Sequence, residues 1–330
     1  MKPARRRFLR LAAGAAALPT LPHFASAQTA YPSRPITMVV PFAAGGPTDV
    51  IGRVLAERMR SSLGQTVIVE NTTGAGGTIG TGRLARAAPD GYTIGIGQNG
   101  SQVITGATYS NLPYDLLKDF APLTLVCITP FMVVAKKAVP ADDLKSFIAW
   151  LKANPNKTVG TAGQGSISHV CGLIFQNATA TQLQFVPYRG IAPAMQDVVA
   201  GQIDMVISDP VATLQHVRAG IIKAYAVCAN ARLASAPELP TVDEAGLPGY
   251  HVALWHGLWL PRGTPKPVLD KLHAAAVEAL ADPAVRSRLE ALGQDIYPRE
   301  RQTPEALGVH QKAEIEKWWP IIKAGNIKVE

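Results

Sequence analysis

Residues 36–49 read Ile-Thr-Met-Val-Val-Pro-Phe-Ala-Ala-Gly-Gly-Pro-Thr-Asp, an apolar run that ends in a glycine-rich turn. The run predicts a buried strand, and Pro47 has the fixed φ that suits the first position of a helix. Gly45 and Gly46 leave no side chain between the backbone and a ligand. The amides of Thr48, Asp49 and Val50 are then expected to be unpaired at a helix start, where partial positive charge attracts a carboxylate or phosphate. The same pattern is also typical of an ordinary tight turn.

The length and composition indicate a globular protein of two domains. The chain has 330 residues, of which 47% are hydrophobic and 17% are charged. This length exceeds what one small core usually organises, and this composition is that of a folded chain rather than a disordered one. We therefore expect two domains, each with a substantial apolar core.

The N-terminal residues 1–27 have the features of an export signal. They contain five basic and no acidic residues, an apolar run at 11–18, and Ala-Ser-Ala at 25–27 as a small-x-small cleavage site. The order Arg-Arg-Arg-Phe-Leu-Arg at 5–10 resembles a twin-arginine signal, and an ordinary secretory signal with a long basic end is the alternative. Either signal predicts a periplasmic protein.

The positive charge of the chain lies mostly in this leader. The formal net charge is +8, and five of those charges fall within residues 1–27, which leaves +3 for the rest. So small a surplus argues against binding to a phosphate backbone, and no nucleic-acid partner is expected. The sequence after residue 27 also lacks a run of about 20 apolar residues, the length that crosses a bilayer.

Two blocks of alternating strands and helices follow the leader. In the first block, three predicted strands end in small or amide residues, near positions 42, 71 and 98. Carboxyl ends of parallel strands meet at one edge of a sheet, so these ends are expected to converge. The second block repeats the organisation, with a strand at 158–161 that leads into a glycine- and serine-rich turn at 162–169. The pattern predicts an α/β protein.

The C-terminal part reads as a connector, a strand and three amphipathic helices. Residues 237–249 are rich in proline and glycine, residues 255–260 are strand-like, and the helices follow from about residue 268. Pro320 lies inside the last helix, and a proline there is expected to kink or restart it.

No cofactor or metal site is predicted. The seven histidines are scattered without metal-ligand spacing, and neither a P-loop nor a complete dinucleotide fingerprint is present. Cys127, Cys171 and Cys228 permit at most one disulfide, and buried free thiols are the simpler interpretation.

A secreted hydrolase is the alternative from another functional class. Ser168 or Cys171 with His169 offers a nucleophile and a base, and Asp209 a third member. However, adjacent helical residues point about 100° apart, so Ser168 and His169 do not naturally face each other. The G-x-S-x-G elbow is absent as well.

Asp49 and Asp209 each end a strand-to-helix turn, one in each block. Aspartate in such a place is typical of a helix cap. The functional alternative is that either carboxylate receives an ammonium or hydroxyl group of a ligand whose own carboxylate lies on the nearby amides.

Five segments, in order along most of the chain, carry a family resemblance. They are residues 41–49, 163–169, 187–190, 240–249 and 257–265, which read Pro-Phe-Ala-Ala-Gly-Gly-Pro-Thr-Asp, Gly-Gln-Gly-Ser-Ile-Ser-His, Pro-Tyr-Arg-Gly, Pro-Thr-Val-Asp-Glu-Ala-Gly-Leu-Pro-Gly and Gly-Leu-Trp-Leu-Pro-Arg-Gly-Thr-Pro. Together they resemble the Bug family, the extracytoplasmic solute receptors of tripartite tricarboxylate transporters. Pro210 after Asp209 and Pro320 in the last helix depart from the expected pattern.

The resemblance implies a two-domain α/β periplasmic-binding-protein fold of type II, a Venus flytrap with its ligand cleft between the domains. It places domain 1 at 29–128 and 252–330, and domain 2 at 129–251. It implies a monomer that binds a small organic carboxylate (a di- or tricarboxylate, an amino acid or an aromatic acid), for membrane permease subunits or for sensing. The ligand-binding residues that it implies are Phe42, Ala43, Gly45, Thr48, Asp49, Gly163, Gly165, Ser166, Ser168, Tyr188, Gly190 and Asp209.

Overall fold

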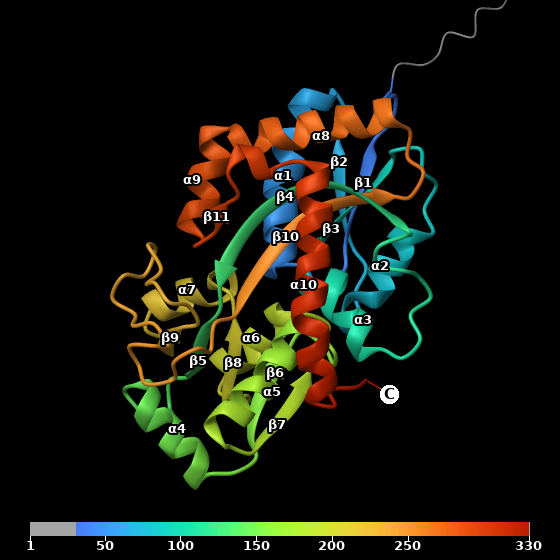
Figure 1. Ribbon diagram of the computed structural model, residues 1–330. Helices are drawn as coiled ribbons and strands as arrows, with labels where there is room; N and C mark the ends of the chain where they lie inside the picture. The colour runs from blue at the N-terminus through green and yellow to red at the C-terminus, as the bar shows by residue number, and fades with distance from the viewer. Residues whose placement is uncertain (1–30, 330) are drawn as a thin grey trace, which may run out of the picture.

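The computed structural model describes residues 31–329, which form two β-sheets with helices packed around them (Figure 1). The predicted export signal at 1–27 lies outside the described residues. None of the helices in the described part of the chain is long and apolar enough to cross a membrane. The expected α/β fold class is confirmed.

The first sheet has six strands in the order β11-β4-β10-β3-β1-β2. β1 pairs in parallel with β2 and β3, and β10 pairs antiparallel with β3 and β4. The bounds are β1 Ile36–Val40, β2 Val67–Asn71, β3 Thr93–Gln98, β4 Phe120–Pro130, β10 Ala253–Pro261 and β11 Asp295–Ile296.

The second sheet has five strands in the order β7-β6-β8-β5-β9 and repeats the arrangement of the first. β6 pairs in parallel with β7 and β8, and β5 is the antiparallel strand between β8 and β9. The bounds are β5 Met132–Lys136, β6 Lys157–Thr161, β7 Leu183–Pro187, β8 Met205–Ser208 and β9 Ile222–Val227. Each sheet therefore has one antiparallel strand inserted between two others, β10 between β3 and β4 and β5 between β8 and β9.

The chain crosses between the sheets twice, and the two crossings are hydrogen-bonded to each other. The first is at Phe131, between β4 and β5, and the second runs from the end of β9 to the start of β10. The Phe131 amide donates to the Val252 carbonyl (2.9 Å), and the Cys228 amide donates to the Phe131 carbonyl (2.8 Å). This pairing joins the two halves of the molecule at one place.

The helices follow the predicted order, with each long amphipathic segment forming a helix. They are α1 Pro47–Leu63, α2 Thr78–Ala85, α3 Thr105–Thr108, α4 Leu144–Ala153, α5 Ile167–Thr179, α6 Ile191–Val199, α7 Pro210–Arg218, α8 Lys266–Ala281, α9 Pro283–Ala291 and α10 Pro304–Ala324. Cys127, Cys171 and Cys228 are free and buried, as expected.

Helix α10 runs through Pro320 as one helix, so the expected restart at this residue is wrong, while a kink there stays a prediction. Pro320 removes one amide donor, and its ring crowds the carbonyl of residue 316. Both Pro320 and Glu316 are exposed, so water can satisfy that carbonyl, and only one turn of helix remains after the proline. The helix packs against β4 of the first sheet and against α3.

Glu314 on α10 fixes two indole rings. Its Oε2 accepts hydrogen bonds from Trp255 Nε1 on β10 (3.0 Å) and from Trp318 Nε1 (3.1 Å). Trp255 and Trp318 are 1% and 3% exposed, so neither indole can turn to water instead. One carboxylate therefore ties the last helix to a central strand.

We predict that Glu314→Ala lowers the free energy of unfolding by about 2 kcal/mol or more, because it leaves two buried N–H donors without their acceptor. Denaturant unfolding measures the change. Glu316→Ala, an exposed position on the same helix, is the control and is expected to cost little. Equal losses in the two variants would contradict this role of Glu314.

Candidate ligand-binding site

A small cavity of about 30 Å³ lies between the two sheets and takes its walls from both. It is lined by mostly apolar side chains with a few polar ones. The lining residues are Phe42, Gly46, Pro47, Thr48, Gln98, Phe131, Ala162, Ile167, Ser168, Ile191, Ser208 and Leu254. None of these carries a charge, so any anion held here must be bound by amides and hydroxyl groups.

The start of α1 supplies amides at this cavity. Gly46 is the N-cap residue and makes no side-chain cap, and Pro47 is the first helical residue. By contrast, side chains cap α4, α5, α7, α9 and α10. The first amides of a helix have no partner within it. The expected unpaired amide of Val50 is wrong, because this amide donates to the Gly46 carbonyl (3.0 Å) as the first bond of the helix. Since Gly46 offers no side-chain cap, the Thr48 and Asp49 amides at this helix start are suited to an anion.

Three other amides of the first loop are engaged within the protein. Ala43 donates to the Arg189 carbonyl (3.3 Å), and Gly46 donates to the Ala43 carbonyl (3.3 Å). Gly45 donates to Asp49 Oδ2 (2.8 Å). These bonds shape the loop, and the three amides that make them are not free to bind a ligand.

The second loop brings serine hydroxyls to the same cavity. Ser168 Oγ accepts a hydrogen bond from the Ala162 amide (2.8 Å) and lies 3.1 Å from Ser166 Oγ. Ser166 in turn is the N-cap residue of α5 and accepts from the His169 amide. Gly163 and Gly165 have φ of +119° and +71°, which allow the turn between β6 and α5.

The loops of the two sheets touch each other around this cavity. A Cβ added at Gly190 would lie 2.8 Å from the Ala43 amide nitrogen, and one at Gly76 would lie 2.9 Å from the Gln164 carbonyl oxygen. Tyr109 also donates to that carbonyl (2.9 Å). The absence of side chains at Gly76 and Gly190 therefore permits the close approach of the two halves.

Six of the twelve predicted residues lie in three places. Phe42, Thr48 and Ser168 line the cavity. Gly163 and Tyr188 line a neighbouring open groove of about 690 Å³. A Cβ at Gly165 would meet Val329 and Tyr109, so this glycine packs against the C-terminal residues.

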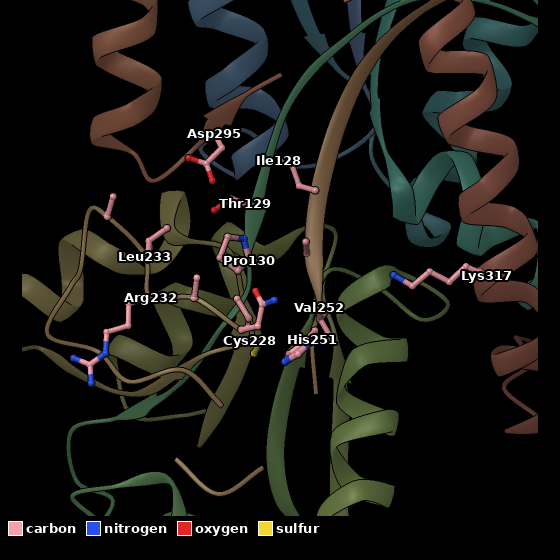
Figure 2. A pocket seen from close by; sticks show the side chains of 15 residues that line it. Ile128, Thr129, Pro130, Cys228, Arg232, Leu233, His251, Val252, Asp295 and Lys317 are labelled. Atoms are coloured by element: carbon pink, nitrogen blue, oxygen red, sulfur yellow. The ribbon is translucent and has the colours of Figure 1, made fainter. Parts of the chain in front are cut away.

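A separate groove of about 460 Å³ lies over the crossing segments (Figure 2). It is lined by residues of β4, of the β9–β10 connection and of α10, and it contains none of the predicted site residues. In Figure 2, Arg232 points away from its centre, while Asp295 and Lys317 lie on different sides. The charged groups of this groove do not converge on one point.

Comparison with known proteins identifies the family. Residues 51–327 match the family model of the tripartite tricarboxylate transporter family receptor. The chain belongs to this receptor family. A UPF0065 protein from the TAR-I ttuE-ttuC' intergenic region of Agrobacterium vitis is 40% identical to it over 92% of this chain and 87% of that protein. BugT of Bordetella pertussis is 34% identical over 91% of this chain and 92% of that protein.

Solved structures agree with this assignment. The periplasmic binding protein BugD superposes with a TM-score of 0.88 at 42% identity, over 91% of this chain and all of that one. MatC of Rhodopseudomonas palustris with bound malate superposes with a TM-score of 0.85 at 38% identity, over 88% of this chain and all of that one. An R. palustris protein with adipate superposes with a TM-score of 0.85 at 29% identity, over 91% of this chain and all of that one. The receptor is thus a solute-binding protein with the fold of the periplasmic binding proteins, as predicted.

The hydrolase alternative has no support in the receptor. Ser168 Oγ is occupied by the Ala162 amide, and His169 Nδ1 accepts from the Gly165 amide (3.2 Å). Among the described residues, no hydrogen bond joins Ser168 to His169. Burial raises the pKa of the Cys171 thiol well above its ordinary value, which disfavours a thiolate. The family and its solved members are receptors and not enzymes.

The two aspartates of the predicted site are buried and have different partners. Both carboxylate oxygens of Asp49 are engaged, by Gly45, Asn71 and Arg53. Asp209 caps α7 by accepting from the Ala212 amide, with Pro210 as the first helical residue. Its second oxygen, Oδ2, is buried and finds no hydrogen-bond partner among residues 31–329.

Three polar residues in or near the cavity, Gln98, Ser208 and His256, were not predicted from the sequence. Gln98 and Ser208 line the cavity from the ends of β3 and β8, where a polar residue after an apolar strand is the available signal. His256 Nε2 lies 3.2 Å from Thr48 Oγ1, and burial lowers the pKa of His256 to about 3. This histidine is therefore neutral at physiological pH. It lies in the middle of β10, and nothing in its neighbouring residues indicates a contact with position 48.

The burial of Asp209 should make the free energy of unfolding depend on pH. Burial raises its pKa from 3.8 to about 7, against the lowering effect of the Ala212 and Val211 amides. The folded state then keeps a proton up to about pH 7 that the unfolded chain releases near pH 4. Stability is consequently lost as the pH rises from about 4 to about 7. At about 1.4 kcal/mol per pKa unit, the loss is about 4 kcal/mol.

We expect Asp209→Asn to keep the helix cap without this penalty. The Tm of the variant minus that of the wild type should increase as the pH rises from 4 to 7 and should stay constant above pH 7. Thermal unfolding at pH 4 to 8 measures the difference. A difference that does not change with pH would show that Asp209 titrates normally in the folded state.

Proposed function

We propose that this receptor captures a small dicarboxylate by closing two domains around it. The bound solute is then handed to membrane permease subunits or sensed. The observation that carries the proposal is the uncharged cavity between the sheets, with the uncapped start of α1 on one side and Ser168 on the other. The solved relatives with malate and adipate support a dicarboxylate as the ligand class.

The proposed ligand contacts come from both halves. The first half contributes the loop at 42–49, with the Thr48 and Asp49 amides as the main donors. The second half contributes hydroxyls and backbone from three turns. The full proposed set is Phe42, Ala43, Gly45, Thr48, Asp49, Gly163, Gly165, Ser166, Ser168, Tyr188, Gly190 and Asp209, the last by its position directly after Ser208 of the cavity wall.

The proposed domains are residues 29–128 with 252–330, and residues 129–251. The paired crossings at Phe131 and Val252 are the natural hinge, because within residues 31–329 the backbone passes between the sheets only at these two segments. Closure excludes water from the ligand and strengthens its hydrogen bonds, and neither half encloses the anion alone. A monomer that is exported to the periplasm by the signal at 1–27, through the twin-arginine route, completes the proposal.

The ligand class is tested by calorimetric titration of residues 28–330. We expect saturable binding of at least one of succinate, malate and adipate, and no binding of the matching uncharged diamide. Amino acids, aromatic acids and tricarboxylates complete the panel. If no carboxylate in the panel binds, the proposed function is wrong.

Closure is tested by Gly190→Ala. The φ of Gly190 is 164°, extended backbone that alanine adopts freely, so the fold should tolerate the change. The added Cβ would lie 2.8 Å from the Ala43 nitrogen of the other half and so opposes only the closed arrangement. We expect unchanged Tm and binding weakened about tenfold or more, equivalent to about 1.4 kcal/mol.

Gly308→Ala on α10 is the matched control, because the nearest atom to its added Cβ is 3.7 Å away. It should bind ligand like the wild type. Equal affinities of the Gly190 and Gly308 variants would argue against closure between these loops.

A further inference from the structure

We infer that Asn71 is a positioning residue that fixes the first loop in its anion-binding shape, and that the Asp49 side chain acts with it rather than contacting the ligand. This inference rests on the proposed function, because it assigns a role within the proposed binding site. Asn71 is the last residue of β2, the strand next to β1, which leads into the loop.

Asn71 holds both ends of the loop with its side-chain amide. Nδ2 donates to the Phe42 carbonyl (2.9 Å) at the beginning of the loop and to Asp49 Oδ1 (2.9 Å) at its end. An amide nitrogen has two hydrogens, so these two bonds use its full donor capacity. The geometry therefore closes the loop at 42–49 into a ring through one side chain.

Asp49 completes the same ring from inside. Its Oδ2 accepts from the Gly45 amide (2.8 Å), and Gly45 adopts a φ of +78°, a conformation that side chains rarely take. The Arg53 guanidinium, one turn later on α1, pairs with both oxygens, at 3.0 Å to Oδ2 and 2.9 Å to Oδ1. Four donor contacts leave the carboxylate little capacity for a ligand group.

The charges of this cluster also suit an anionic ligand. Burial raises the pKa of Asp49, but the contacts with Arg53, Gly45 and Asn71 outweigh this and lower it overall, so Asp49 is ionised. A bare carboxylate beside the helix start would repel the carboxylate of a ligand. Pairing with Arg53 cancels that charge and leaves the partial positive charge of the α1 N-terminus for the ligand.

The test measures the affinities of succinate, malate and aspartate for the mature protein and for the variants Asn71→Ala and Asp49→Ala. These ligands have similar carboxylates and differ in one group: succinate lacks a substituent, malate has a hydroxyl and aspartate an ammonium group. We expect Asn71→Ala to weaken every ligand that the wild type binds by the same factor, about tenfold. In Asp49→Ala the ratios among the three affinities should remain those of the wild type.

A loss in Asp49→Ala that is confined to malate or aspartate would overturn the inference, because it would show direct recognition of the hydroxyl or ammonium group. Wild-type affinities in Asn71→Ala would overturn it as well. Asn154→Ala is the control, since Asn154 makes a similar bond to the Trp150 carbonyl at the end of α4, away from the loop. It should leave affinity unchanged.

A second measurement needs no ligand and separates this inference from the proposed function. Amide hydrogen exchange of Gly45 should accelerate in Asp49→Ala, because its acceptor is gone, and should be unchanged in Asn154→Ala. If none of the three acids binds the wild type, the proposed function fails while the exchange result still reports on the loop. Unchanged Gly45 exchange in Asp49→Ala would contradict the role given to Asp49.

Discussion

The site depends on a helix start that the protein itself does not cap. Gly46 has no side chain to offer to the first amides of α1, whereas five other helices are capped by aspartate, serine or threonine. A helix start without a cap needs another acceptor, and the apolar cavity beside it holds no charged side chain. In the proposed function a small anion supplies this acceptor, and exclusion of water strengthens its hydrogen bonds.

The architecture places this helix start opposite its counterpart. Both sheets share one strand order, with an antiparallel strand inserted beside the parallel ones. Residues at or just after the ends of β1, β3, β6 and β8 line the same cavity. Gly190 is the N-cap residue of α6 in the second half, and it too makes no side-chain cap. The Ala43 amide bonds the carbonyl of the preceding residue, Arg189, across the two halves. Glycine at these points is what allows the two loops to approach.

Much of the fold was predictable from the sequence, because apolar residues recur at the spacing of strands or helices and glycine or proline marks where these elements end. The loop at 36–49, the strand ends near 98 and 161, and the family resemblance all led to the same region.

The sequence could not indicate which hydrogen-bond donors of this region are already bonded within the protein. The Gly45 amide is bonded to Asp49, and Asn71 closes the loop through space, 22 residues away from Asp49. His256 likewise meets Thr48 only through the pairing of distant strands. The helix does not restart at Pro320 because this residue is exposed and only one turn of helix follows it.

The most direct test is a crystal structure of residues 28–330 of the receptor with a bound dicarboxylate. We predict a ligand carboxylate between the two sheets, within about 3 Å of the Thr48 and Asp49 amide nitrogens, with Ser168 on the opposite side and the Asp49 side chain still bonded to Gly45 and Asn71. A dicarboxylate bound instead in the groove over the crossing segments, or held by a charged side chain, would contradict it.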